Sequence, residues 1–190
     1  MIEIAPDAVI IALDPATTTG YAIGAATGDV KPFLGAVNLK HDETDTHADI
    51  FGRAFRWIAG LIEINQPALF AIEPPVPPGN MWGNSNYNTT ALALGFNGIF
   101  IGAAAHKGVA VLPAPIFTWR KHFLGPGNAK LERAKAKLAA VKQCRLLGWS
   151  APNDDAAEAG GIWDWARGEI ARQQLARRGA PLALFQGDRE

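Results

Sequence analysis

The chain has 190 residues, of which 48% are hydrophobic, a formal net charge of zero and a single cysteine. This length and composition predict one α/β domain with a real core, and the lone Cys144 excludes an intrachain disulfide framework and a cysteine-rich zinc site. The sequence opens without a basic leader and has no unbroken apolar run of about 18 residues, so we expect a cytoplasmic protein with neither signal peptide nor membrane span.

Three β-type runs open the chain, at about residues 8–14, 20–26 and 32–40, joined by short glycine-containing turns. They predict an antiparallel meander. The first run ends at Asp14, followed by Pro15. A buried strand rarely ends in a charge without a partner, which favours a functional acid, although Asp-Pro is also a common turn former.

An amphipathic helix and a second acid-terminated strand follow. Apolar residues recur at three-and-four spacing from Ile50 to Ile62, which predicts a helix packed on the sheet. A proline ends the helix, and residues 68–73 form a buried strand that finishes in Glu73. Glu73 is therefore a candidate partner of Asp14.

Residues 74–88 are too rich in Pro, Gly and Asn for regular structure and predict a loop beside the acids. Two of its aromatic residues, Trp82 and Tyr87, are candidates for stacking against DNA bases, while packing of the loop onto its own domain is an equally good interpretation. The apolar helix predicted at residues 90–106 contains small residues that permit a close helix approach, for example across a dimer.

Residues 107–145 form a basic region hidden within a neutral chain, because they carry nine Lys and Arg residues against Glu132 alone. A short strand at 109–113 and helices at 117–124 and 129–147 are predicted here. A charged helix face is ordinarily just a solvated face, but so few interspersed acids favour an anionic partner. The candidate phosphate contacts are Arg120, Lys121, Lys130, Arg133, Lys135 and Lys137. The apolar stripe expected on the second helix is Leu131, Ala134, Leu138 and Val141.

A third group of acids stands at the start of the last predicted helix. Asn153 is a candidate N-cap, and acids after it suit the positive end of a helix, which explains Asp154 and Asp155 without any function. Glu158 is harder to dismiss in this way. It lies one turn beyond either aspartate, so either pair can share a helix face.

Two strand-end acids and a helical acid pair predict a carboxylate cluster, which is costly unless cations hold it together. Hard divalent ions such as Mg²⁺ prefer oxygen ligands, and two such ions can stabilise both the attacking and the leaving oxygen of a phosphodiester while activating water. The four histidines are scattered along the chain. The sequence therefore offers neither a Ser-His-Asp catalytic arrangement nor a pair of histidine metal ligands as an alternative to the carboxylate site.

In order and spacing these motifs resemble the RuvC-like Holliday junction resolvases, closest to the variety met in phages and prophages. The resemblance spans roughly residues 9–166. The segments that carry it are Leu13-Asp14-Pro15 with Thr19-Gly20-Tyr21-Ala22, Ile72-Glu73, Asp154-Asp155-Ala156-Ala157-Glu158-Ala159, and the basic segment from Trp119-Arg120-Lys121 to Leu147-Gly148-Trp149.

The resemblance implies an α/β, RNase H-like fold with a mixed five-stranded sheet flanked by helices. It also implies a homodimer that holds a four-way DNA junction and Mg²⁺-dependent nicking, with Mn²⁺ as a substitute. The family's four acids, both catalytic and metal-binding, fall on Asp14, Glu73, Asp155 and Glu158. The family usually has Asp at the last position, and Asp154 is an alternative to Asp155 as the ligand.

The resemblance further implies an aromatic residue that inserts at the junction centre, for which Trp82 and Tyr87 are candidates. We expect a RuvC-like nuclease domain at residues 1–170 and a polar tail at 171–190. The predicted activity is structure-selective cleavage of four-way junctions; cleavage of other branched DNA, or junction binding without catalysis, are the alternatives. The run from Asp14 to Gly20 also resembles the phosphate loop of actin-like ATPases and sugar kinases, but those need a second phosphate loop and a second domain, which the chain lacks.

Overall fold

A mixed five-stranded sheet forms the centre of the protein in the computed structural model, which describes residues 4–5, 7–27, 30–75 and 87–177. The strand order is β3-β2-β1-β4-β5. β1, β2 and β3 pair antiparallel, as the predicted meander requires, whereas β4 and β5 run parallel to β1. The strands are β1 (Val9–Asp14), β2 (Thr18–Ala25), β3 (Phe33–Asn38), β4 (Leu69–Ile72) and β5 (Ala110–Pro113).

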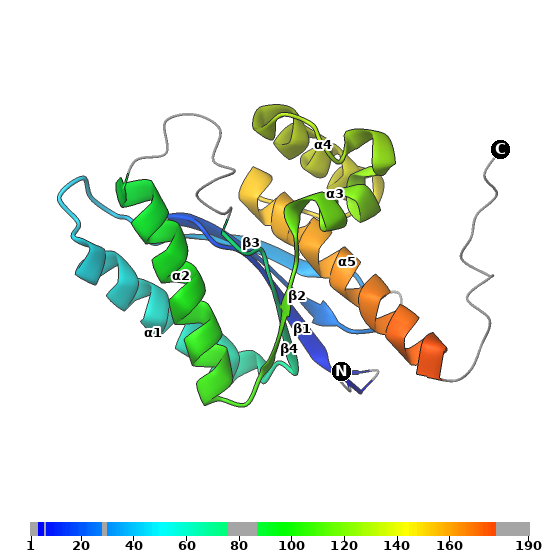
Figure 1. The fold of residues 1–190 in the computed structure, drawn as a ribbon, viewed down its shortest axis with the longest axis horizontal. Coiled ribbons are helices and arrows are strands. Elements are labelled where there is room, and N and C mark those ends of the chain that lie inside the picture. Colours follow the sequence, from blue (N-terminus) through cyan, green and yellow to red (C-terminus); the bar gives the residue numbers. More distant parts are fainter. Residues whose placement is uncertain (1–3, 6, 28–29, 76–86, 178–190) are drawn as a thin grey trace.

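Helices cover both faces of the sheet (Figure 1). α1 and α2 lie on one face, and α5 lies across the other with α3 and α4 packed against it. The α/β architecture predicted from the sequence is therefore confirmed. The helices are α1 (His47–Asn65), α2 (Tyr87–His106), α3 (Ile116–Leu124), α4 (Arg133–Leu146) and α5 (Asp154–Arg177), with a short 3₁₀ turn at Pro126–Asn128.

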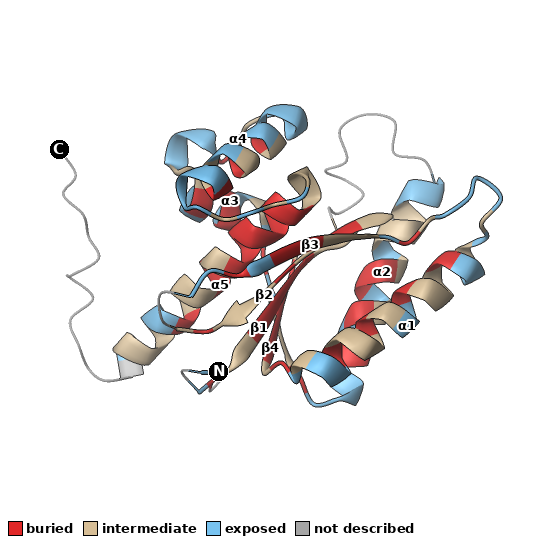
Figure 2. Cartoon of the chain, turned by 180° about the vertical axis from the view of Figure 1, so that it is seen from behind, coloured by how far each residue is buried: buried red, intermediate tan, exposed pale blue. Residues whose placement is uncertain are grey.

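The alternation of side chains along β1 divides the core in two. Ile10 and Ala12 pack toward α5, while Ile11 and Leu13 pack toward α1 and α2, because successive strand residues point to opposite faces. All four side chains are fully buried, and the strand is red along most of its length in Figure 2. Cover on both faces explains why β1 is continuously apolar in sequence.

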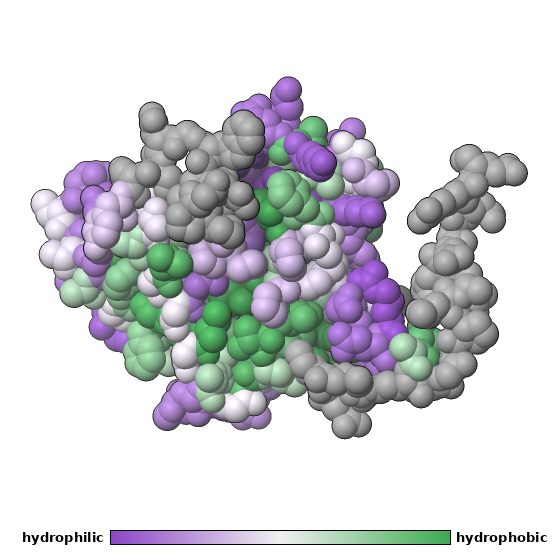
Figure 3. Space-filling model, in the orientation of Figure 1, coloured by the Kyte–Doolittle hydropathy of each residue, from purple (hydrophilic) through white to green (hydrophobic). Residues whose placement is uncertain are grey.

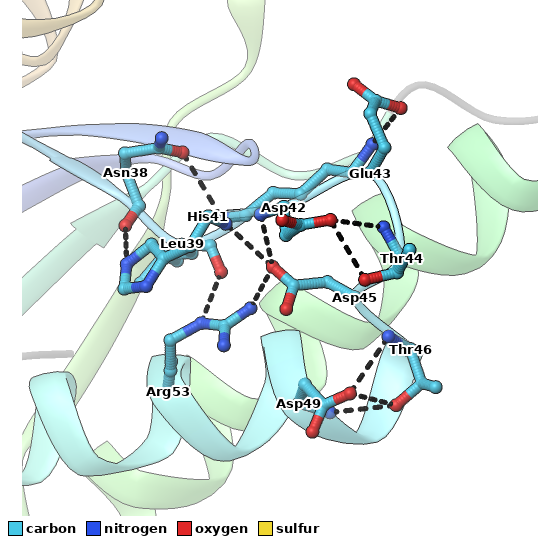
Figure 4. Close-up of polar contacts among 11 residues, drawn as sticks. Asn38, Leu39, His41, Asp42, Glu43, Thr44, Asp45, Thr46, Asp49 and Arg53 are labelled. Atoms are coloured by element: carbon cyan, nitrogen blue, oxygen red, sulfur yellow. Dashed lines mark hydrogen bonds and ion pairs between the residues drawn. The ribbon is translucent and has the colours of Figure 1, made fainter.

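The acid-rich connection between β3 and α1 is tied down by its own side chains (Figure 4). Thr46 and Asp49 form a reciprocal capping box, so α1 begins three residues before the predicted Ile50. Asp45 pairs with Arg53, whose Nε also donates to the Leu39 carbonyl at 2.8 Å. These carboxylates are used locally, and hydrogen bonds from backbone N–H groups hold the pKa of Asp45 below its usual value.

α4 is rotated relative to the sequence prediction. Leu138, expected on the buried stripe, is 72% exposed, and the buried residues are Ala136, Ala140 and Cys144. Their four-residue spacing gives α4 a flat face of small side chains, which lies close enough to α5 for the Cys144 sulfur to approach the Ala157 carbonyl at 3.8 Å. The helix thus packs through small residues and exposes both of its leucines.

α5 also comes unusually close to the sheet. Its first half is lined with alanine and glycine, and the backbone of Asp155 contacts β2 at Gly20. A Cβ atom at Gly20 would overlap the carbonyl of Asp155, so only glycine fits there. α5 continues through Arg177, beyond position 170, so residues 171–177 of the expected tail are helical; residues 178–190 lie outside the described residues.

Replacing Gly20 with alanine should destabilise the protein by about 1–3 kcal/mol, because the new methyl group forces α5 away from β2. Urea denaturation measures this. Gly60→Ala on α1 is the matched control: a Cβ there meets nothing within 4 Å, and it should be neutral or stabilising by up to about 1 kcal/mol. Equal stability of the two variants would show that α5 does not depend on this contact.

Candidate metal centre

Asp14 and Glu73 lie side by side at one edge of the sheet. Asp14 is the last residue of β1, and Glu73 directly follows β4, where its N–H donates to the Leu13 carbonyl at 3.1 Å. β1 and β4 are parallel neighbours, so their carboxyl ends coincide. The sequence-based pairing of these two acids is therefore present in the structure.

α5 brings two further acids to this edge. Oxygen atoms of Asp14, Asp155 and Glu158 all lie within 4.8 Å of one another. Asn153 caps the helix, its side chain accepting the Ala156 N–H at 2.9 Å, as the sequence indicated. Asp154 lies outside the trio; its side chain is 45% exposed against 16% for Asp155. The geometry therefore favours Asp155 over Asp154 as the partner of Glu158.

Two of the predicted DNA contacts are instead engaged with these acids. Arg120 is buried and donates to Glu158 Oε1 at 2.8 Å. The Lys137 ammonium contacts Asp155, lies 3.2 Å from Asp154 Oδ2 and 3.8 Å from Glu158 Oε2. Burial lowers the pKa of Lys137, but its contacts with Asp155 and Asp154 outweigh burial and raise the pKa, so the side chain stays charged.

Trp119 is a site residue that the sequence analysis missed. Its buried indole Nε1–H donates to Glu73 Oε2 at 2.7 Å, so adjacent residues of α3 hold Glu73 and Glu158. The sequence offered one weak signal: a buried tryptophan needs an acceptor for its N–H, and this one directly precedes a basic pair. Its partner could not be known before the fold placed α3 beside β4.

Burial, helped at Asp14 and Glu73 by neighbouring negative charge, shifts the titration of the acids. Burial, followed by the neighbouring Glu73, Glu158 and Asp155, raises the pKa of Asp14 well above its usual value. Burial raises the pKa of Glu73 to about 7, against the opposing effect of the Trp119 hydrogen bond. Burial likewise raises the pKa of Glu158, against the opposing charge of Arg120. A set of close, desolvated carboxylates fits a hard divalent cation, which would relieve this repulsion.

The remaining predicted contacts are exposed to solvent, and one of them, Arg133, is close enough to act on the acids electrostatically. Lys121, Lys130, Arg133 and Lys135 are exposed on α3, α4 and the segment between them. The charge of Arg133 lowers the pKa of Glu73 and Glu158, so this surface borders the acidic cluster. Tyr87 is exposed at the start of α2, whereas Trp82 lies outside the described residues.

The metal-free protein should lose stability as pH rises from about 4.5 to above 7. The folded pKa values of Asp14 and Glu73 are raised, so folding favours their protonated forms, and this contribution disappears as pH passes the folded pKa of about 7 for Glu73. Urea denaturation in EDTA at pH 5 and pH 8 measures the loss. Mn²⁺ should restore stability at pH 8 far more than at pH 5.

Asp14→Asn is the control for this pH dependence, since it removes one charge of the cluster and should flatten the decline. Stability that is unchanged or rises between pH 5 and pH 8 in wild-type protein would contradict the prediction.

Solved structures share this fold although sequence comparison finds nothing: no protein-family model and no curated protein matches the chain. Thermus thermophilus RuvC aligns at 20% identity and a TM-score of 0.61, covering 90% of this chain and 97% of RuvC. RuvC of the same organism in complex with a Holliday junction substrate gives 18% identity, a TM-score of 0.65, and 88% and 96% coverage. The yeast mitochondrial Holliday junction resolvase Ydc2 gives 11% identity, a TM-score of 0.62, and 93% and 86% coverage. The chain therefore has the RuvC-like, RNase H-like fold that its motifs predicted.

Proposed function

We propose that this protein is a structure-selective endonuclease that resolves four-way DNA junctions by metal-dependent phosphodiester hydrolysis. The observation that carries the proposal is the convergence of Asp14, Asp155 and Glu158, with Glu73 beside them, on a fold shared with a RuvC solved on a Holliday junction substrate. An exposed basic surface beside the acids adds a means of holding phosphates.

The four acids would hold Mg²⁺, or Mn²⁺ in its place. A bound divalent ion supplies Lewis acidity and an activated water at neutral pH. The chain's own residues position the acids: Trp119 fixes one oxygen of Glu73, and Arg120 fixes one oxygen of Glu158. Burial of both donors keeps the geometry rigid before DNA arrives.

Nicking of a mobile four-way junction in Mg²⁺, with EDTA and linear duplex as controls, tests the activity. Asp14→Asn, Glu73→Gln and Asp155→Asn should each lower cleavage by orders of magnitude while junction binding persists, because each removes metal-binding charge without enlarging the side chain. Asp154→Asn is the matched control and should keep most activity, since its side chain is not part of the carboxylate trio.

Each outcome of this assay bears on one assignment. Substantial Mg²⁺-dependent cleavage by Asp14→Asn would refute the cluster as the active site. An inactive Asp154→Asn beside an active Asp155→Asn would move the ligand by one residue. Wild-type protein that binds but never cuts junctions would favour the binding-only alternative, and a preference for flaps or forks would favour other branched DNA as substrate.

The exposed cations near the acids are proposed phosphate contacts. Neutralising Lys130, Arg133 and Lys135 to glutamine should weaken junction binding, because fewer counterions are then released from the DNA when the protein binds. The slope of log affinity against log salt should fall by up to about 0.9 for each phosphate that is no longer neutralised. Lys137 is left intact because it contacts the acids.

A control set removes the same number of positive charges from outside the 107–145 region, at Lys40, Arg56 and Arg172. This triple variant should leave the salt slope unchanged. An equal fall of the salt slope in both triple variants would show that Lys130, Arg133 and Lys135 are ordinary solvated side chains and not phosphate contacts.

α2 supplies the surface for the proposed homodimer. Among the described helices, α2 alone has the length and apolar composition of a membrane span, but Phe96, Phe100 and Ala104 pack it into the core with α1. Its other face carries exposed Leu94 and Ile101 and no charged residue, and Figure 3 shows hydrophobic residues gathered around its C-terminal half and the following strand. A second copy of this helix would bury that surface.

Solution mass by light scattering tests the dimer. Wild-type protein should have twice the chain mass of 20.2 kDa, and Leu94→Glu with Ile101→Glu should give a monomer, because two buried charges at the interface are costly. Ile64→Glu, at an exposed position on α1, is the control and should leave the dimer intact. A monomeric wild type, or a dimer that survives the double change, would contradict this interface.

The free, buried Cys144 agrees with the proposed cytoplasmic location. Burial raises the pKa of its thiol to about 11, so the group is an inert part of the α4–α5 contact rather than a reactive site.

A further inference from the structure

Lys137 differs from the other Lys and Arg residues of α4 in its burial, because those residues are exposed to solvent. Its ammonium group lies among Asp154, Asp155 and Glu158, and only 16% of the side chain is exposed. Lys135, on the same helix, is exposed to solvent. The charge of Lys137 therefore lies, with that of Arg120, where the carboxylates of the candidate metal centre converge.

The packing of α4 puts the lysine there. The buried stripe of Ala136, Ala140 and Cys144 fixes the rotation of the helix against α5. Lys137 directly follows the first residue of that stripe, so its stem runs along the helix contact toward the start of α5. The placement results from the fold and not from a chance surface encounter.

The two cations on Glu158 differ in how replaceable they are. Arg120 is buried and donates to Oε1 at 2.8 Å, a short charge-assisted bond. Lys137 is 3.8 Å from Oε2 and also contacts an acid that belongs to the trio, Asp155. A flexible lysine stem can withdraw and return its charge to water, whereas the buried guanidinium cannot.

We propose that the Lys137 ammonium is the resident counter-ion of the carboxylate cluster, which neutralises Asp155 and Glu158 in the absence of metal and competes with the divalent cation for their oxygens. The inference rests on the proposed metal site but concerns its regulation. Lys137 stabilises the empty cluster and weakens metal binding, because a divalent ion must displace it or share the site with another cation.

Metal binding by the free protein, without DNA, tests this competition. In a calorimetric titration with Mn²⁺, Lys137→Met should bind at least about tenfold more tightly than wild type, because the competing charge is gone while the stem remains. The same variant should unfold at lower temperature than wild type in EDTA. Lys135→Met is the control and should change neither quantity, while Lys137→Arg, which keeps the charge, should stay close to wild type.

Unchanged or weaker Mn²⁺ binding by Lys137→Met would overturn the inference. A wild-type protein that binds no divalent ion would overturn it together with the proposed metal site, whereas a wild type that binds metal but cuts no junction would leave it standing without the proposed activity.

A second measurement needs no destabilised variant. In wild-type protein labelled with ¹³C at lysine Cε, saturating Mg²⁺ should move the Lys137 resonance, assigned by its loss in Lys137→Arg, toward those of the exposed lysines. A Lys137 resonance that stays in place while Mg²⁺ saturates the protein would also overturn the inference.

Discussion

The close approach of α5 to the sheet is the constraint on which the site depends. Gly20 offers no side chain, so the backbone of Asp155 lies against β2 at the position paired with Asp14. This contact turns two acids of a helix toward two acids at strand ends. Burying like charges so closely is unfavourable, as the raised pKa values of Asp14 and Glu73 reflect. The cluster of acids therefore lowers the stability of the fold locally, and it favours the binding of cations.

The layer formed by α3 and α4 offsets much of that cost. Trp119 and Arg120 reach Glu73 and Glu158 from α3, and Lys137 reaches Asp155 from α4. Each donor is partly or fully buried, so it also excludes water from the acids. The same two helices expose the remaining cations on their outer side. One layer therefore neutralises the acids on its inner side and presents positive charge to solvent on its outer side.

The sequence predicted those features of the fold that local residue patterns determine. Runs of aliphatic residues placed the strands, and the acid at the end of each of two buried runs marked Asp14 and Glu73 as candidate partners. The parallel pairing of β1 and β4, seen in the structure, puts both at one edge of the sheet. Rotation about a helix axis was not predictable for α4, since alanine, leucine and cysteine gave competing stripes and only the partner surface of α5 selects the small one. Trp119 was missed for the same reason: its acceptor is 46 residues away along the chain.

Glu158 stands where the RuvC-like family that the sequence resembles usually has Asp, and the structure shows how the longer side chain fits. Family members usually have the shorter Asp at this position, yet here the acid must accept from Arg120 while its second oxygen faces the cluster. Arg120 already has a buried Nε without a partner among the described residues, so a shorter acid would leave the guanidinium still less satisfied. α5 cannot move closer, because its backbone already touches β2 at Gly20. The longer acid therefore reaches Arg120 and the acidic cluster at once, and the buried arginine gives its charge a partner.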